Sequence, residues 1–165
     1  MRFKILIWTV AMFEHPEMYI LRHGETIWNW QGRYQGRKDL PLIEKGRQQA
    51  VSQRKLLNAI EMLPWKVFVS PLGRTVETAR LAVTFVDHPI VDDGLQELNF
   101  GKWEGTTKQK ITKQTDCSFD DGSWYFNSSE GETFEMISAR ALEFLDCLDE
   151  PAVLVTHGVT SRVLR

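Results

Sequence analysis

Short apolar runs that alternate with long helical stretches are the feature that most constrains the fold of this chain. The runs Met18–Leu21, Val67–Ser70 and Ala152–Thr156 each end at polar or glycine residues, as buried parallel strands do. Glu44–Leu63 is rich in Gln, Arg, Lys, Leu and Ala and stops at Pro64, which is typical of a crossover helix. The alternation predicts an α/β fold in which right-handed crossovers cover both faces of a mainly parallel sheet.

A second long helix is predicted in the last third of the sequence. Apolar residues recur there at every third or fourth position, at Phe134, Ile137, Ala141, Leu145 and Leu148. Residues with that spacing share one face of a helix, which can pack against the sheet. Another helix is expected from Gly158 onward, directly after the last apolar run.

Length and composition fit one globular domain. The chain has 165 residues, 42% of them hydrophobic, and a net charge of −2, which argues against disorder and against a polyanion-binding surface. Because no repeat or linker interrupts the sequence, we expect one domain over residues 18–165 after an N-terminal extension of residues 1–17. Cys117 and Cys147 stand alone, which favours buried reduced thiols over a disulfide, and no metal site is expected.

The N-terminal extension contains an apolar run, residues 5–13, after Arg2 and Lys4. The positive charges before the run and the length of the run are those of a secretory signal. However, residues Glu14–Glu17 stand where small residues should mark a cleavage site. The run is also too short to span a bilayer. A buried strand or helix is therefore the favoured interpretation, with a cytoplasmic location and no membrane partner.

Charged side chains follow the predicted strands directly. Arg22 and His23 come after the first strand, Arg74 comes shortly after the second, and His157 follows the third. Because the carboxyl ends of parallel strands meet at one edge, where such sheets bind ligands, we expect one cationic pocket there. A single His or Arg at a strand end is more often structural, so the combination carries the argument.

The segment Leu21–Asn29 (LRHGETIWN) resembles the signature of the histidine phosphatase superfamily in its phosphoglycerate-mutase-like branch. Other segments resemble that branch in the same order, namely Gly32–Asp39 with Pro41 and Leu42, Ser70–Ala79, Glu97–Gly105, Gly131 with Glu132, and Val155–Gly158. The resemblance runs from about residue 18 to the last residue. It implies a three-layer α/β/α sandwich.

Relatives in that family usually continue past the segment that follows the second histidine. By this resemblance the domain is expected to be shortened at its C-terminus. Apolar surface near Val163 and Leu164 should then be left uncovered, and a homodimer is one way of covering it.

The resemblance also implies roles for individual residues. His23 is expected to attack the phosphoryl group as a neutral imidazole, oriented by a backbone carbonyl that Gly24 lets the chain bring close. Arg22 and Arg74 are expected to hold the phosphoryl oxygens. Glu97 matches the family's acid and base, since a carboxyl group can protonate the leaving oxygen and later activate water.

The remaining pocket residues are assigned in the same way. Asn29 and His157 resemble the other phosphate contacts, with His157 as a donor that can be cationic near neutral pH. Thr26, Gln35 and Gly158 are expected to line the same pocket, and residues 116–129 are expected to cover its mouth. Glu104 is the structural rival of Glu97.

The sequence therefore favours a phosphatase that hydrolyses phosphomonoesters of a small metabolite without a cofactor, in a pocket that also takes inorganic phosphate or another oxyanion. A phosphoglycerate-mutase-type phosphotransferase is the alternative. Only 60 residues separate Glu97 from His157, and family mutases carry longer segments there. A non-catalytic module that binds phosphorylated ligands is a further alternative. Trp28–Lys38 interleaves aromatic and basic residues as a nucleic-acid surface would, but the net charge argues against nucleic acid.

Overall fold

The computed structural model describes residues 15–60, 65–114 and 123–165. Its sheet has four strands, all paired in parallel, in the order β1-β4-β2-β3. Their bounds are Met18–Arg22 for β1, Lys66–Val69 for β2, Ile90–Val91 for β3 and Ala152–Thr156 for β4. The three predicted strands are confirmed with shifts of one residue at most. The edge strand β3 was missed, because two residues are too short a run to form a pattern.

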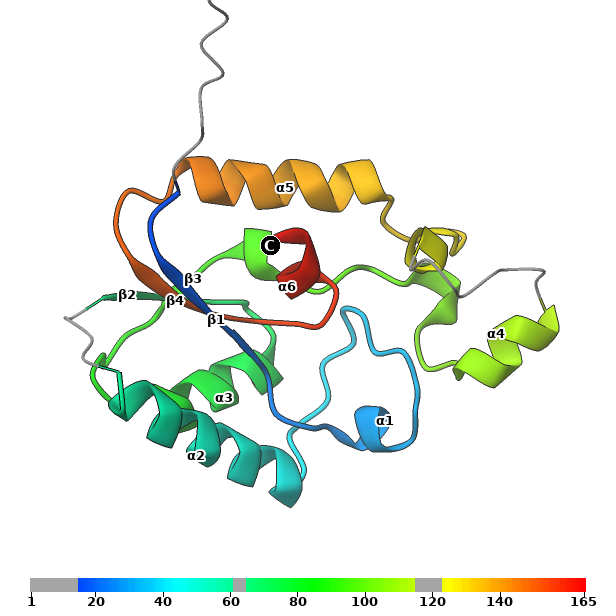
Figure 1. Ribbon diagram of the computed structural model, residues 1–165. Coiled ribbons are helices and arrows are strands. Elements are labelled where there is room, and N and C mark those ends of the chain that lie inside the picture. Colours follow the sequence, from blue (N-terminus) through cyan, green and yellow to red (C-terminus); the bar gives the residue numbers. More distant parts are fainter. Residues whose placement is uncertain (1–14, 61–64, 115–122) are drawn as a thin grey trace, which may run out of the picture.

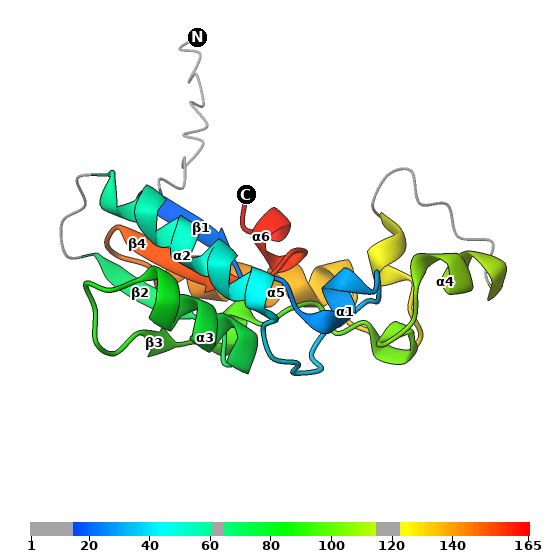
Figure 2. The ribbon, with the colours of Figure 1, turned by 90° about the horizontal axis from the view of Figure 1, so that it is seen from below.

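Helices cover both faces of the sheet, as Figures 1 and 2 show. α2 (Glu44–Asn58) and α3 (Gly73–Ala82) lie on one face, and α5 (Phe134–Asp146) and α6 (Thr160–Val163) lie on the other. α2 and α3 carry the chain from β1 to β2 and on to β3, whereas α5 returns it to β4. Since such crossovers are right-handed, the reversal of direction places α5 on the opposite face. The three-layer α/β/α sandwich is therefore confirmed.

The central strand β4 supplies the core of both layers. Val153 and Val155 belong to an apolar cluster with residues of α2 and α3. Ala152 and Leu154 point to the other face and pack in a cluster with Phe144 of α5. All five residues of β4 are buried because helices cover both faces of the sheet. The strand is therefore apolar from Ala152 to Val155 instead of alternating between apolar and polar residues.

Shorter elements make the connections around the sheet. They are the helices α1 (Ile27–Trp30) and α4 (Lys108–Gln114) and the 3₁₀ turns η1 (Asp93–Leu95), η2 (Gly101–Trp103) and η3 (Ser123–Phe126). α4 lies at one end of the molecule, away from the sheet (Figure 2). None of the described helices has the length and apolar character needed to cross a lipid bilayer.

The helix predicted over residues 44–63 ends earlier than expected. α2 stops at Asn58, and the backbone N–H groups of Ala59 and Ile60 donate to carbonyls three residues back. These tighter bonds close the last turn before the predicted stop at Pro64, which lies outside the described residues. α3 was not predicted, although its residues belong to a quoted motif.

Among the predictions about apolar residues of the last third, one is wrong and one is confirmed only in part. Phe134 is 52% exposed although it shares the predicted face of α5, because it is the first residue of the helix and extends beyond the core. Leu164 was expected on uncovered apolar surface but is 6% exposed, since α6 folds back and adds it to the cluster of α5 and β4. The expected uncovered apolar surface is found beside Val163, which is only partly buried and lines an open cavity with the exposed Phe134 and Leu142.

The predicted burial of both cysteines is not confirmed. Cys147 is a free thiol and is exposed, because it follows the last turn of α5 at the molecular surface. Cys117 lies outside the described residues, as does the apolar run of residues 5–13.

Candidate active site

Backbone hydrogen bonds continue the sheet beyond the strands and bring the predicted residues together. The N–H of His23 donates to the carbonyl of Thr156 at 3.0 Å, and the N–H of Ser70 donates to that of Val155 at 3.1 Å. The rings of His23 and His157 consequently lie edge to face, with 5.2 Å between their centroids. The predicted meeting of the two histidines at the carboxyl edge of the sheet is confirmed.

His23 is held as a neutral ring with one nitrogen fixed. Its Nδ1 lies 2.7 Å from the carbonyl oxygen of Gly24, so this nitrogen carries the proton and donates it. Burial, together with the positive charge of Arg74, lowers the pKa of His23 to about 3. Nε2 then keeps its lone pair, and no described residue bonds to it. A neutral imidazole with a free Nε2 is equipped to act as a nucleophile.

A close approach of two glycines sets the position of the His23 turn. A Cβ atom on Gly24 would lie 2.2 Å from the carbonyl oxygen of Gly46 in α2. A Cβ atom on Gly46 would lie 2.2 Å from the carbonyl oxygen of Glu25. Both contacts are with backbone, which cannot easily move aside. The role of Gly46 was missed, although a glycine inside a helical pattern costs stability and often signals close packing.

Arg74 is fully buried and is anchored by the loop before α2. Its two terminal nitrogens donate to the carbonyls of Lys38 and Gly36 at 2.8 and 2.7 Å. Its Nε is buried and has no partner among the described residues. Burial lowers the pKa of Arg74 to about 10, against the opposing effect of the Glu97 and Asp39 carboxylates, so the group stays charged near neutral pH.

A cavity of about 300 Å³ opens beside these side chains. Most of the predicted site residues line it, namely His23, Asn29, Gln35, Arg74, Glu97 and Gly158. Tyr125 and Arg162 also line it, and Arg162 donates to the Tyr125 hydroxyl at 2.7 Å. Neither was predicted as a site residue. Tyr125 falls within the segment 116–129 that was expected at the mouth, of which residues 116–122 lie outside the described residues.

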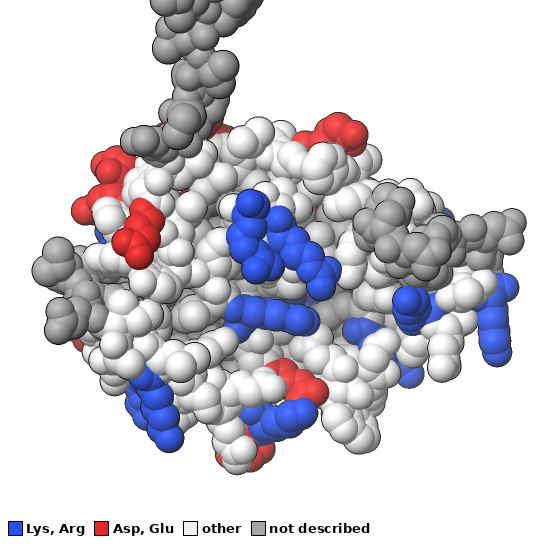
Figure 3. All heavy atoms as spheres, in the orientation of Figure 1, with Lys and Arg blue, Asp and Glu red and all other residues white. Residues whose placement is uncertain are grey.

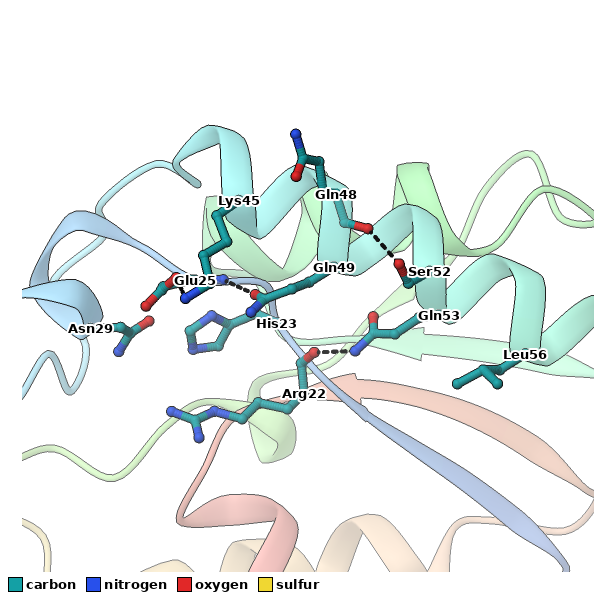
Figure 4. A pocket seen from close by; sticks show the side chains of 10 residues that line it. All are labelled: Arg22, His23, Glu25, Asn29, Lys45, Gln48, Gln49, Ser52, Gln53 and Leu56. Atoms are coloured by element: carbon teal, nitrogen blue, oxygen red, sulfur yellow. Dashed lines mark hydrogen bonds and ion pairs between the residues drawn. The ribbon is translucent and has the colours of Figure 1, made fainter.

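Arg22 lies at the rim rather than inside. It is exposed and lines an adjoining cavity of about 560 Å³ with His23, Asn29 and a row of polar side chains on α2 (Figure 4). On its other side it borders a further cavity with Arg162 and Arg165. Figure 3 shows basic side chains gathered on this face, over α6 and the end of β1. The predicted cationic pocket therefore takes its positive charge from arginines and not from the histidines.

Thr26 does not line the pocket, contrary to the prediction. It is fully buried, caps α1, and donates from its hydroxyl to Oε1 of Gln35 at 2.6 Å. Its backbone N–H donates to Oδ1 of Asn29 at 3.1 Å. Because the amide oxygen of Asn29 is engaged, its NH₂ group is the part left to meet a ligand. Thr26 therefore orients two pocket residues, Asn29 and Gln35, without lining the cavity itself.

The carboxylate of Glu97 is held by the segment that follows His157. Its oxygens accept from the backbone N–H groups of Gly158 at 2.9 Å, Val159 at 3.1 Å and Thr160 at 3.2 Å. The rival Glu104 does not line the cavity and accepts from the backbone N–H of Arg37 at 2.8 Å. Of the two glutamates, only Glu97 is placed beside His23.

His157 is not a cationic donor, and that expectation is wrong. It is fully buried, and burial together with the Arg74 charge lowers its pKa well below the usual value. Its Nε2 lies 2.7 Å from the Ser70 hydroxyl, while its Nδ1 has no partner among the described residues. Within the described ranges no group of three or more His, Cys, Asp or Glu is arranged to hold a metal ion.

Comparisons with known proteins agree with this architecture. The histidine phosphatase superfamily (branch 1) matches residues 18–165. An Enterobacter sp. protein named "Probable phosphoglycerate mutase GpmB" is 34% identical over 154 residues, which is 87% of this chain and 70% of that protein. The chain therefore belongs to the histidine phosphatase superfamily.

Solved structures are similar at the same level. TTHB049 from Thermus thermophilus has a TM-score of 0.73 at 33% identity, over 88% of this chain and 81% of that one. The Rv3214 protein from Mycobacterium tuberculosis has a TM-score of 0.77 at 30% identity, over 92% and 78%. An Escherichia coli protein described as a "putative alpha-ribazole-5'-P phosphatase" has a TM-score of 0.75 at 28% identity, over 92% and 78%.

Proposed function

We propose that this protein is a phosphatase that hydrolyses phosphomonoesters of a small metabolite through a phosphohistidine on His23. The observation that carries the proposal is the neutral His23 ring, whose Nδ1 is tied to the Gly24 carbonyl at 2.7 Å and whose pKa is lowered to about 3. Such a ring keeps Nε2 unprotonated over the whole physiological pH range. Membership of a superfamily of phosphatases and mutases supports the same chemistry.

In the first half-reaction the Nε2 lone pair of His23 attacks phosphorus, and the bond between phosphorus and the ester oxygen breaks. Glu97, in its protonated form, gives its proton to the leaving oxygen. Arg74, through its unpartnered Nε, and the Asn29 amide hold the phosphoryl oxygens. Arg22 contributes positive charge from the rim.

In the second half-reaction water attacks the phosphohistidine. The Glu97 carboxylate takes a proton from that water, the bond between phosphorus and nitrogen breaks, and inorganic phosphate leaves. The same carboxyl group serves both steps, because the proton that it gives in the first step is replaced by the one that it takes in the second.

The test is hydrolysis of an aryl phosphate by the purified protein and by His23→Ala. We expect phosphate release by the wild-type protein, unchanged by a chelator, and loss of nearly all of it in the variant, because the nucleophile is gone. His88→Ala, which removes an exposed imidazole, is the control. Turnover by His23→Ala equal to that of the wild-type protein would contradict the proposal, and so would loss of wild-type turnover on adding a chelator. A wild-type protein that binds phosphate but does not hydrolyse the ester would favour a non-catalytic module.

A mutase is the second candidate, favoured by the name of the Enterobacter relative. It would use the same phosphohistidine but return the phosphoryl group to a substrate hydroxyl. Incubation with 3-phosphoglycerate distinguishes the two, because a phosphatase releases inorganic phosphate whereas a mutase yields the 2-phospho isomer.

The predicted cytoplasmic location and the predicted homodimer stay predictions.

A further inference from the structure

We propose that Ser70 is a positioning residue that fixes the tautomer of His157, so that Nδ1 of His157 carries the proton and donates it to the oxyanion held at His23. The inference rests on the proposed function, since it describes how one donor of that site is prepared. The sequence interpretation placed Ser70 in a motif without a role. Its hydroxyl and the His157 ring come from the ends of the neighbouring strands β2 and β4.

The contact between the two side chains is short and completely enclosed. Ser70 Oγ lies 2.7 Å from Nε2 of His157, and both residues have 0% exposure. The described residues offer the Ser70 hydroxyl no other hydrogen-bond partner. The hydroxyl is therefore committed to His157, either as the donor or as the acceptor of this single bond.

The number of buried polar groups left without a hydrogen-bond partner distinguishes the two arrangements. If Ser70 donates to Nε2, the proton of His157 sits on Nδ1, and only that N–H lacks a partner before a ligand binds. If His157 donates from Nε2, the Ser70 O–H and the Nδ1 lone pair both stay unsatisfied in a buried place. Each buried unsatisfied polar group costs about 1–3 kcal/mol, so the first arrangement is favoured.

The ligand favours the same arrangement. The His157 ring lies edge to face with the His23 ring, 5.2 Å away, and the charges of Arg74 and Arg22 act on both rings. A phosphoryl oxyanion bound at His23 attracts an N–H group and repels a nitrogen lone pair. Because burial keeps His157 neutral, it has one ring proton to place, and the Ser70 bond decides where it goes.

The experiment reads the tautomer directly by ¹⁵N NMR of the histidine-labelled protein. We expect Nε2 of His157 without a proton and Nδ1 with one in the wild-type protein, and a shift of the population toward protonated Nε2 in Ser70→Ala. Ser70→Thr, which keeps the hydroxyl, should restore the wild-type signals. Ser138→Ala, which removes a buried hydroxyl of α5 that has no partner in the described structure, is the matched control.

Vanadate affinity and kcat/KM provide the functional readouts. We expect Ser70→Ala to weaken both about tenfold to a hundredfold, as loss of one buried donor implies, and Ser70→Thr to recover most of the loss. A wild-type protein with the proton on Nε2, or a Ser70→Ala protein with an unchanged tautomer, would overturn the proposal. If Ser70→Ala fails to fold, the wild-type spectrum alone decides. Absence of turnover together with the expected tautomer would instead count against the phosphatase function only.

Discussion

At the scale of single residues, burial of His23 makes the stability of the fold depend on pH. The folded-state pKa of about 3 lies below the value of about 6.5 in an unfolded chain, so between these values only the unfolded chain binds the proton. Stability therefore falls as the pH falls through this window, by up to about 1.4 kcal/mol per pH unit for each such group.

His23→Gln should remove that share of the pH dependence. Urea denaturation at several pH values between about 4 and 5.5 should give a slope smaller by about 1.4 kcal/mol per pH unit than in the wild-type protein. His88→Gln, in which the replaced ring is exposed, serves for comparison. An unchanged slope in His23→Gln would mean that the ring is not held neutral by the fold.

The proposed role of Glu97 as the proton donor can be tested by varying the leaving group. Glu97→Gln keeps the size but removes the acidic proton, so we expect turnover to fall by roughly 10² to 10⁴. The fall should be smaller for aryl phosphates whose leaving group is already stable as an anion. Initial rates over a series of leaving groups measure this, and an equal fall along the series would refute Glu97 as the acid.

At the scale of elements, the contact between α2 and the turn after β1 leaves no room for a side chain at Gly46. Gly46→Ala would improve the intrinsic helix propensity of α2, yet its Cβ would lie 2.2 Å from the carbonyl oxygen of Glu25. We expect the clash to win and the free energy of unfolding in urea to fall by about 1–3 kcal/mol. Ser52→Ala on the exposed side of α2 should cost little. A Gly46→Ala protein as stable as the wild type would show that α2 can move away freely.

At the scale of the whole molecule, an oxyanion should stabilise the fold by binding only its native state. Vanadate at 100 times its dissociation constant adds about 2.7 kcal/mol, which is visible as a rise in melting temperature. Arg74→Ala should lose most of this rise, measured against its own baseline. Arg80→Ala, on the same helix but exposed, should keep it. A rise of equal size in both variants would place the bound anion elsewhere.

Local patterns in the sequence were sufficient to predict the three long strands, the two long helices and the edge of the sheet where Arg22, His23 and His157 are found. Apolar spacing and breaker residues act within a few positions, and a parallel sheet brings strand ends together by its geometry. The motifs that resemble the family also identified Glu97 and Arg74. The ends of the elements were less well predicted, as α2 illustrates, because capping depends on single hydrogen bonds.

Only the tertiary structure decided how the site residues behave. Thr26 proved to be a buried cap, His157 a neutral ring bonded to Ser70, and Gly46 the partner of the His23 turn. Each property depends on what a distant segment places next to the residue. Burial and electrostatic shifts arise from the summed neighbours in space, whereas the sequence alone specifies only the neighbours along the chain.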